Sequence, residues 1–200
     1  MGKTKNSIIS EKLDVPVDGA KFLNPEKIVK EMEIKPGMII ADFGCGTGYF
    51  CFPLAQKVGK GGKIYAIDIL NSKLETVASQ AKLSGINNII TSRANLEATE
   101  GSKLQKESVD WVILVNMLFQ NNSEGKKKIM QEAKRVLKKG GNILVIEWDK
   151  DKSTIGPEKT IRVSKDEMMR IAREYGLGIA TEIPVSDFHY GMILAKYKEN

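Results

Sequence analysis

The sequence predicts an α/β fold in which helices cover both faces of a mostly parallel sheet. Strand-like apolar runs alternate along the chain with amphipathic, helix-like runs. Such alternation requires crossover connections, and a crossover returns the chain to a strand parallel to its neighbour. The runs "WVILV" at 111–115 and "ILVI" at 143–146 show no alternation of polar and apolar residues, which indicates strands buried on both faces.

The order of the elements follows from these runs. Strands are expected at 38–43, 63–68, 88–93, 109–116 and 142–148. Helices are expected at 49–58, 72–84, 125–138 and 164–176. One more amphipathic helix is expected within 22–34, where Pro25 suits the first turn. No internal repeat, low-complexity linker or domain boundary interrupts this order.

Residues typical of helix ends support these bounds. Ser164 precedes Glu167 by three positions, as in an N-terminal capping box, and Gly176 suits the C-terminal end of the same helix. Gly140 and Gly141 are expected to end the helix that precedes the fifth strand.

The tail of the chain holds two more strand-like runs. "IATEIPV" at 179–185 and "YGMILAKY" at 190–197 have no helix between them. A hairpin is the expected connection, so the last strand should run antiparallel to the others.

Length and composition indicate one globular domain. A chain of 200 residues is long enough for one core and short for two, so residues 1–200 are expected to form a single domain, with 1–21 as an N-terminal extension. The hydrophobic content of 42% and the charged content of 28% are close to those of soluble proteins. The apolar runs are too short to span a membrane, and "MGKTKNSIIS" lacks the apolar stretch of a signal peptide. A cytoplasmic protein is therefore expected.

The net charge of +6 is concentrated in one segment. Residues 124–139 contain seven Lys or Arg and two Glu, and the apolar residues of this segment share one helix face. A solvated outer face is favoured over an RNA-binding or membrane-binding patch, because no aromatic residues interleave with the lysines.

The sequence favours no metal site. It contains two cysteines, Cys45 and Cys51, which are not spaced as a CxxC pair, and one histidine. The usual ligands of a zinc site are therefore too few. Cys45 is interpreted as a small apolar residue packed against the neighbouring backbone.

The stretch "DFGCGTGYF" at 42–50 predicts a ligand-binding loop. In a parallel sheet, ligands bind outside the carboxyl ends of the strands, and the first strand ends at this loop. Glycines let the backbone bend and leave its N–H groups open near a helix N-terminus. Dinucleotides and S-adenosylmethionine both suit such a loop. The dinucleotide pattern G-x-G-x-x-G/A requires a small residue at position 49, so Tyr49 argues against a dinucleotide.

A second feature agrees with a nucleoside ligand. The second expected strand ends in Asp68, which follows the last glycine of the loop, Gly48, by about the spacing of a ribose-binding carboxylate. An unpaired acid at the end of a buried strand is costly, which favours ligand roles for Asp42 and Asp68.

At this point the chain resembles a known family. "DFGCGTG", "YAIDI" and "RVLKKGGNILVIEW" are similar to the class I S-adenosylmethionine-dependent methyltransferases, especially the branch that resembles the ubiquinone and menaquinone biosynthesis methyltransferases. The resemblance covers about residues 22–197. It implies a Rossmann-like three-layer sandwich with a seven-stranded, mostly parallel sheet whose last strand is antiparallel, and S-adenosyl-L-methionine as the cofactor.

The resemblance also implies roles for the residues of the loop. Asp42 matches the acid near the methionine amino group, and Gly44, Gly46 and Gly48 match the loop beneath the methionine and ribose. Asp68 matches the carboxylate that binds both ribose hydroxyls.

Further matches follow along the chain. Ile69 is placed beside the adenine, and Leu96 is included with Asn95 at the adenine end of the site. Asn95 stands where the family commonly has an aspartate, and its carbonyl can accept a hydrogen bond from the adenine amino group. Asn116 matches the residue whose backbone lies beside the sulfonium. Asn95 and Asn116 could instead cap the helices that follow them.

Methyl transfer requires no catalytic triad, because in-line displacement depends on positioning and on the exclusion of water. No catalytic residue is therefore assigned. Glu147, Trp148 and Asp149, at the end of the fifth strand, are candidates to face the acceptor. For His189, a hydrogen-bonded structural role is favoured, on the reasoning that the last strand can begin away from the cofactor.

The expected acceptor is a small molecule, with nucleic acid disfavoured because strand four ends in "NMLFQNN" and not in an Asn-Pro-Pro-Tyr-type motif. The apolar residues near this strand end suit a partly apolar acceptor but are equally compatible with ordinary core: Met117, Leu118, Phe119, Phe22 and Leu23. Two other functions stay open, a non-catalytic cofactor-binding sensor or partner subunit and an RNA-binding module. The sequence indicates no oligomeric state.

Overall fold

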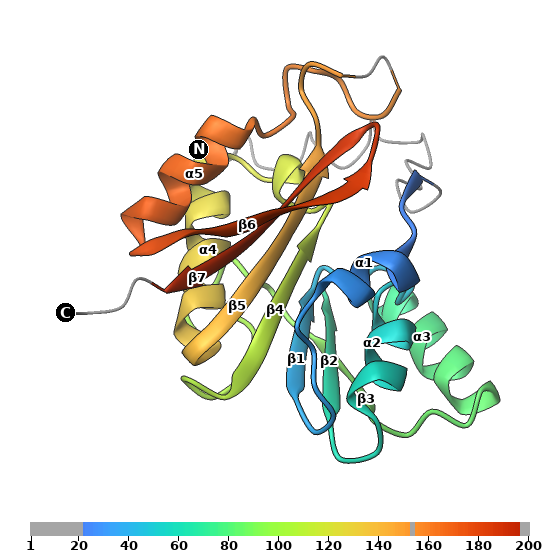
Figure 1. Ribbon diagram of the computed structural model, residues 1–200. Helices are drawn as coiled ribbons and strands as arrows, with labels where there is room; N and C mark the ends of the chain where they lie inside the picture. Colours follow the sequence, from blue (N-terminus) through green and yellow to red (C-terminus); the bar gives the residue numbers. More distant parts are fainter. Residues whose placement is uncertain (1–21, 153–154, 197–200) are drawn as a thin grey trace, which may run out of the picture.

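The computed structural model describes residues 22–152 and 155–196, so the expected N-terminal extension at 1–21 lies outside the described residues. Figure 1 shows one sheet with helices packed around it. The helices are α1 (Pro25–Glu31), α2 (Cys51–Val58), α3 (Asn71–Leu83), the short 3-10 helix η2 (Leu118–Gln120), α4 (Ser123–Val136) and α5 (Lys165–Glu174). The strands are β1 (Ile39–Phe43), β2 (Lys63–Asp68), β3 (Ile89–Arg93), β4 (Val109–Val115), β5 (Leu137–Trp148), β6 (Leu177–Ser186) and β7 (His189–Lys196).

The sheet has the order β3-β2-β1-β4-β5-β7-β6. The pairs among β3, β2, β1, β4 and β5 are parallel, whereas β7 is antiparallel to both β5 and β6. The predicted seven-stranded, mostly parallel sheet with an antiparallel last strand is therefore confirmed. The hairpin between β6 and β7 is also confirmed, and it inserts β7 between β5 and β6.

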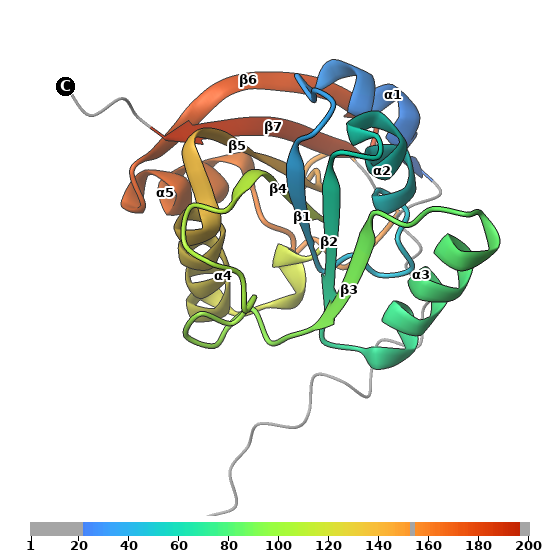
Figure 2. The same ribbon diagram turned by 90° about the horizontal axis from the view of Figure 1, so that it is seen from below.

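Two apolar cores lie on opposite faces of the sheet. Helices α4 and α5 cover one face, and α1, α2 and α3 cover the other (Figure 2). Ile129 and Met168 represent the first core, and Leu54 and Val77 the second; all four side chains are buried. Strand β4 contributes Trp111 to one core and Val112 to the other, as expected for a strand buried on both faces.

Most helix ends fall where the sequence predicts them. The Ser164 side chain accepts a hydrogen bond from the backbone N–H of Glu167, and Gly176 follows α5 with a φ of +67°. The expectation that Gly140 and Gly141 end α4 is wrong. The helix ends at Val136, and the buried Leu137 already pairs with β4, so both glycines lie inside β5.

The cations of the basic segment are largely paired with acids. Lys126 lies 2.9 Å from Glu167, and Lys127 lies 2.7 Å from Glu174, so α5 neutralises part of the charge of α4. This pairing favours the solvated outer face that the sequence predicts. The disfavoured role of nucleic acid stays a prediction. Among the described residues, no helix is long and apolar enough to cross a membrane.

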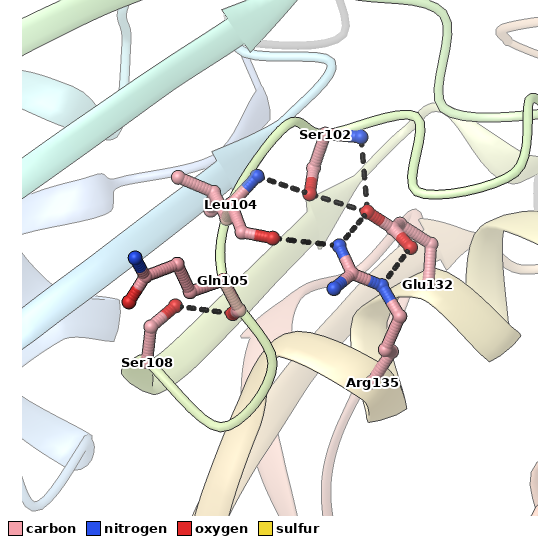
Figure 3. A network of polar contacts seen from close by, with 6 residues as sticks. All are labelled: Ser102, Leu104, Gln105, Ser108, Glu132 and Arg135. Atoms are coloured by element: carbon pink, nitrogen blue, oxygen red, sulfur yellow. Dashed lines mark hydrogen bonds and ion pairs between the residues drawn. The ribbon is translucent and has the colours of Figure 1, made fainter.

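A buried polar network anchors the long connection between β3 and β4 on α4 (Figure 3). Glu132 accepts hydrogen bonds from the backbone N–H and the hydroxyl of Ser102, and its carboxylate pairs with Arg135 at 2.7 Å. Arg135 also donates to the carbonyl of Leu104 at 2.8 Å. The network therefore holds the segment that follows β3 against α4.

Candidate functional site

A cavity of about 460 Å³ lies at the carboxyl ends of β1, β2, β3 and β4. Strand β1 has β2 on one side and β4 on the other, so the cavity opens where the direction of the strand order reverses. Eight of the nine residues expected to bind the cofactor line it: Asp42, Gly44, Gly46, Asp68, Ile69, Asn95, Leu96 and Asn116. The structure thus brings these residues together, while their binding roles stay predictions.

The ninth residue, Gly48, belongs to the glycine loop but does not line the cavity. Its φ is +86°, and a Cβ added there would lie 3.0 Å from side-chain atoms of both Phe52 and Val77. The absence of a side chain at Gly48 therefore permits close packing between the loop, α2 and α3.

Gly46 faces open space. Its φ is +53°, and a Cβ built on it would meet no atom within 4 Å. The residue lines the cavity, so a side chain at Gly46 would enter the space available to a ligand. At Gly44, by contrast, the added atom would lie 3.2 Å from Cβ of Met117.

Asp68 joins the loop to the end of β2. Its Oδ2 accepts the N–H of Gly46 at 3.0 Å, and its Oδ1 accepts the N–H of Leu70 at 2.9 Å. Each oxygen uses one lone pair in these bonds and keeps another for a ligand donor. Two adjacent hydroxyl groups are suitable donors for such a carboxylate.

Asp42 is a buried carboxyl at the end of β1, and 3% of its surface is exposed. Burial raises its pKa to about 7, the nearby Asp68 also raises it, and a hydrogen bond from Cys51 opposes the rise. The Cys51 thiol donates to Oδ2 of Asp42 at 3.1 Å. A cationic ligand group would stabilise the ionised form of this carboxyl.

The adenine end of the expected site is apolar and partly open. The side chains of Ile69 and Leu70 are each 55% exposed, whereas Leu96 is buried. The side-chain oxygen of Asn95 accepts the N–H of Glu97 at 3.0 Å, which closes a local turn. The next element along the chain is β4, so the helix cap considered for Asn95 is not formed, and one lone pair of the same oxygen is left for adenine.

Asn116 follows β4 in the left-handed region, with a φ of +51°. Its side-chain amide nitrogen lies 3.1 Å from Nε2 of His189, whose Nδ1 lies 2.9 Å from Oγ of Ser186. His189 is buried, and the hydrogen bonds expected of it are present, while its structural role stays a prediction. The reason given for it is wrong, because His189 contacts a residue of the cavity wall.

The family described as "Methyltransferase domain" matches residues 34–180. The chain belongs to the methyltransferase domain family. The demethylmenaquinone methyltransferase of Lactococcus lactis is 32% identical over 60% of this chain and 46% of its own length. The nocamycin O-methyltransferase of Saccharothrix syringae is 32% identical over 36% of this chain and 26% of its own length. The chain thus spans about half of the first of these curated relatives and about a quarter of the second.

A solved structure agrees over almost the whole chain. The S-adenosylmethionine-dependent methyltransferase from Aquifex aeolicus is 26% identical, with a TM-score of 0.78, and the match covers 96% of this chain and 98% of that one. The predicted Rossmann-like fold is therefore confirmed. The predicted resemblance to the menaquinone branch is confirmed too, through the relative from Lactococcus.

The three residues considered as candidates to face the acceptor, at the end of β5, lie outside the cavity lining. Glu147 and Trp148 are buried, and neither they nor Asp149 belong to the cavity lining. Glu147 accepts the N–H groups of Met117 and Leu118 at 3.1 and 2.7 Å. Burial raises the pKa of Glu147 to about 8, although these backbone bonds oppose the rise. The structure therefore does not bring these three candidates into the cavity, and Glu147 instead holds the backbone of the turn after β4 through its two hydrogen bonds.

Several residues of the methyltransferase domain line the cavity without having been predicted. Lys73, Glu97, Gln120 and Asn121 are polar members of this group. The signal for Gln120 and Asn121 was present in "NMLFQNN", since side chains that directly follow the fourth strand reach the same sheet edge. Nothing comparable in the sequence marks Lys73 or Glu97.

Tyr49 also lines the cavity and closes one side of it. Its hydroxyl donates to the carbonyl of Leu23 at 2.8 Å, and this bond ties the glycine loop to the segment that precedes α1. The large side chain of Tyr49, which argues against a dinucleotide, is thus part of the cavity wall and is held there by this hydrogen bond.

Proposed function

We propose that this methyltransferase domain is an S-adenosylmethionine-dependent enzyme that methylates a small-molecule acceptor. One observation carries the proposal: Asp42 and Asp68 flank a loop whose Gly46 faces open space in a cavity at the carboxyl ends of four parallel strands. The arrangement offers one carboxyl for an ammonium group and another for a pair of hydroxyls.

The residues present fit the cofactor. Asp68 keeps lone pairs for the ribose hydroxyls, and Asp42 provides a carboxylate for the amino group of the methionine part. Ile69 and Leu70 are large apolar side chains left exposed beside the cavity, where an adenine ring would cover them.

S-adenosylmethionine, when bound, supplies a methyl group on a positively charged sulfur with a good leaving group. The chain contributes position and shielding. The buried Cys45 and Phe50 line the cavity, and so do Tyr49 and Leu23, which are joined by a hydrogen bond, so these walls limit the access of water. The turn that starts at Asn116 also belongs to the lining.

Two observations support a small acceptor: the names of the relatives and the apolar surface of the cavity. The two curated relatives are named for demethylmenaquinone and nocamycin, which are small molecules. Leu23, Met117 and Ile129 give the cavity apolar surface that suits a partly apolar acceptor. A cytoplasmic location and the lack of a nucleic acid substrate belong to the same proposal.

Calorimetric titration tests the cofactor. We expect S-adenosylhomocysteine to bind with a dissociation constant on the order of micromolar, about −8 kcal/mol, and NAD and NADP to show no binding at millimolar concentration. Asp68→Ala should weaken the binding of S-adenosylhomocysteine tenfold or more, because charge-assisted hydrogen bonds contribute about 1.5–3 kcal/mol each. Binding of NAD without binding of S-adenosylhomocysteine would overturn the assignment. Full affinity for S-adenosylhomocysteine in a folded Asp68→Ala variant would overturn it too.

Turnover separates an enzyme from a binding protein. With labelled S-adenosylmethionine and a panel of small acceptors, an enzyme forms S-adenosylhomocysteine faster when a suitable acceptor is present. A non-catalytic sensor or partner subunit would bind the cofactor equally well and show no acceptor-dependent formation of product.

A further inference from the structure

Two side-chain amides of the turn after β4, those of Gln120 and Asn121, line the cavity. The Gln120 side-chain nitrogen donates to the carbonyl of Asn116 at 2.9 Å, and the Asn121 side-chain nitrogen donates to the carbonyl of Met117 at 2.8 Å. A backbone carbonyl only accepts, so each amide nitrogen must face its carbonyl and each amide oxygen must face the other way.

These two oxygens are available to a ligand. Among residues 22–152 and 155–196, no donor is bonded to the side-chain oxygen of Gln120 or Asn121. Gln120 is exposed and Asn121 is half-buried, so neither residue is enclosed in the core. Because the amides are anchored through nitrogen, they offer acceptors to a ligand without first losing rotational freedom.

A carboxylate lies beside them. A Cβ added to Gly125 would lie 2.8 Å from Oε2 of Glu97 and 3.2 Å from Cβ of Asn121. The Glu97 carboxylate and Asn121 are therefore neighbours at the start of α4. Within the described part of the chain, the lining contains three carboxyl groups, at Asp42, Asp68 and Glu97, and one ammonium group, at Lys73. The cavity is acidic although the whole chain has a net charge of +6.

We propose that Gln120, Asn121 and Glu97 form the acceptor subsite, and that the methyl acceptor is an uncharged or cationic hydrogen-bond donor. The inference rests on the proposed function, because that function assigns the glycine loop, Asp68 and the pair Asn95–Leu96 to the cofactor. Glu97 and the two amides after β4 then face the acceptor, and these three groups accept hydrogen bonds, whereas Lys73 belongs to α3 and follows Asp68. An anionic acceptor such as a carboxylate or phosphate would meet these oxygens without a donor and would be repelled by Glu97.

The chemistry of transfer agrees with such a subsite. A lone pair on the acceptor atom forms the bond to the methyl carbon, and the electron pair of the broken carbon–sulfur bond stays on sulfur. An N–H or O–H on the acceptor atom that donates to Gln120 directs that atom's lone pair away from the amide oxygen. The proton then leaves to water, since an amide is too weak a base to keep it.

Three small probes of similar shape test the subsite on protein saturated with S-adenosylhomocysteine. Resorcinol carries two hydroxyl donors, 1,3-dimethoxybenzene has none, and isophthalate carries two negative charges. In an amide NMR titration we expect resorcinol to shift the resonances of residues 117–121 and to bind about tenfold more tightly than either of the others.

Two variants locate the effect. Gln120→Met keeps the length of the side chain and removes its amide, so it should weaken resorcinol binding about fivefold to tenfold, measured on the variant saturated with S-adenosylhomocysteine. Gln80→Met is the matched control, because Gln80 is an exposed glutamine of α3 outside the cavity lining. It should not change the affinity for resorcinol.

Each result decides the matter. Equal or tighter binding of 1,3-dimethoxybenzene or isophthalate would overturn the proposal, and so would the absence of shifts at residues 117–121 with all three probes. Unchanged resorcinol affinity in the Gln120→Met variant would remove Gln120 from the subsite. If wild-type protein fails to bind S-adenosylhomocysteine, the proposed function itself falls, and this failure is seen before any probe is added.

Discussion

The thiol of Cys51 donates a hydrogen bond to the carboxyl of Asp42, with 3.1 Å between Sγ and Oδ2. Both side chains are buried, one at the end of β1 and the other in the first turn of α2. A hydrogen bond with Cys45 and burial raise the pKa of the Cys51 thiol well above its usual value, so the thiol stays protonated and remains a donor. The ligand cavity thus contains a carboxyl that titrates near neutral pH and is supported by one thiol.

Cofactor affinity should depend on pH through Asp42. Burial raises the pKa of Asp42 to about 7, and only the ionised form attracts an ammonium group. The affinity for S-adenosylhomocysteine should therefore be highest above pH 7 and fall about tenfold per pH unit below it. Calorimetry from pH 5.5 to 8.5 measures this dependence.

Two variants distinguish Asp42 from other titrating groups. Asp42→Asn should bind more weakly at pH 8 and lose the pH dependence. Cys51→Ala should move the wild-type profile toward higher pH by about one unit, because a hydrogen bond to a charged group contributes roughly 1.5 kcal/mol or more. A wild-type profile that is flat between pH 6 and 8 would contradict the role of Asp42.

The second prediction separates space from backbone strain at Gly46. Gly46→Ala should lower the free energy of unfolding by about 1–2 kcal/mol, because its positive φ is unfavourable for alanine. It should also reduce the affinity for S-adenosylhomocysteine strongly, since the added methyl group enters the cavity. Gly37→Ala is the matched control: its φ is +85°, its Cβ would meet nothing within 4 Å, and it lies outside the cavity lining. Equal loss of affinity in both variants would show that strain alone causes the effect.

The order of elements could be predicted because each depends on local patterns. The unbroken apolar run of β4 and the helix-capping residues Ser164 and Gly176 act over a few positions, and the structure agrees with them. Gly140 misled the prediction because a tertiary contact decides that boundary. Leu137 gains more by pairing with β4 in the core than by extending α4 to the glycine.

The residues of the site were predictable where they directly follow or end a predicted strand. Asp42 and Asp68 end strands, so their place at the sheet edge follows from the topology. Glu97 reaches the cavity through a turn, and the direction of Glu147 depends on the alternation of side chains along β5, which an apolar strand buried on both faces does not reveal.

The third prediction concerns the network in Figure 3. Although burial opposes ionisation, hydrogen bonds from Arg135 and Ser102 hold the pKa of Glu132 below its usual value. The ionised carboxylate therefore stabilises the fold above the unfolded-state pKa, and this contribution is lost as the pH falls through the lower folded-state pKa.

Glu132→Gln should lower the free energy of unfolding by about 1–3 kcal/mol at pH 7, measured by urea denaturation, because it breaks a buried ion pair. Glu124→Gln on the same helix is the control. Its pair with Lys128 is exposed at 3.9 Å, so a change below about 0.5 kcal/mol is expected. Equal effects of the two substitutions would mean that Glu132 does not anchor the connection to α4.

The last prediction uses the single histidine of the chain. Burial and the positive charge of Arg162 lower the pKa of His189 to about 4. In the unfolded chain an imidazole has a pKa of about 6.5, so between these values the unfolded state binds more protons than the folded state. Stability should therefore fall as the pH drops from about 6.5 toward 4. His189 lies between Asn116 and Ser186, so in the neutral imidazole one ring nitrogen donates and the other accepts, and the position of the ring proton distinguishes the two tautomers.

Nitrogen-15 NMR of the imidazole measures both the titration and the tautomer, without overlap from another histidine. We expect a neutral imidazole above about pH 5, with the same single nitrogen protonated throughout that range, and the nitrogen shifts identify which one it is. His189→Gln, which keeps an acceptor for Asn116, should remove the part of the acid destabilisation that lies between pH 6.5 and 4, while Asp42 and Glu132 continue to titrate. An imidazole that titrates near pH 6.5 would show that His189 is not buried against Asn116, and the wall of the cavity after β4 would then lack this contact.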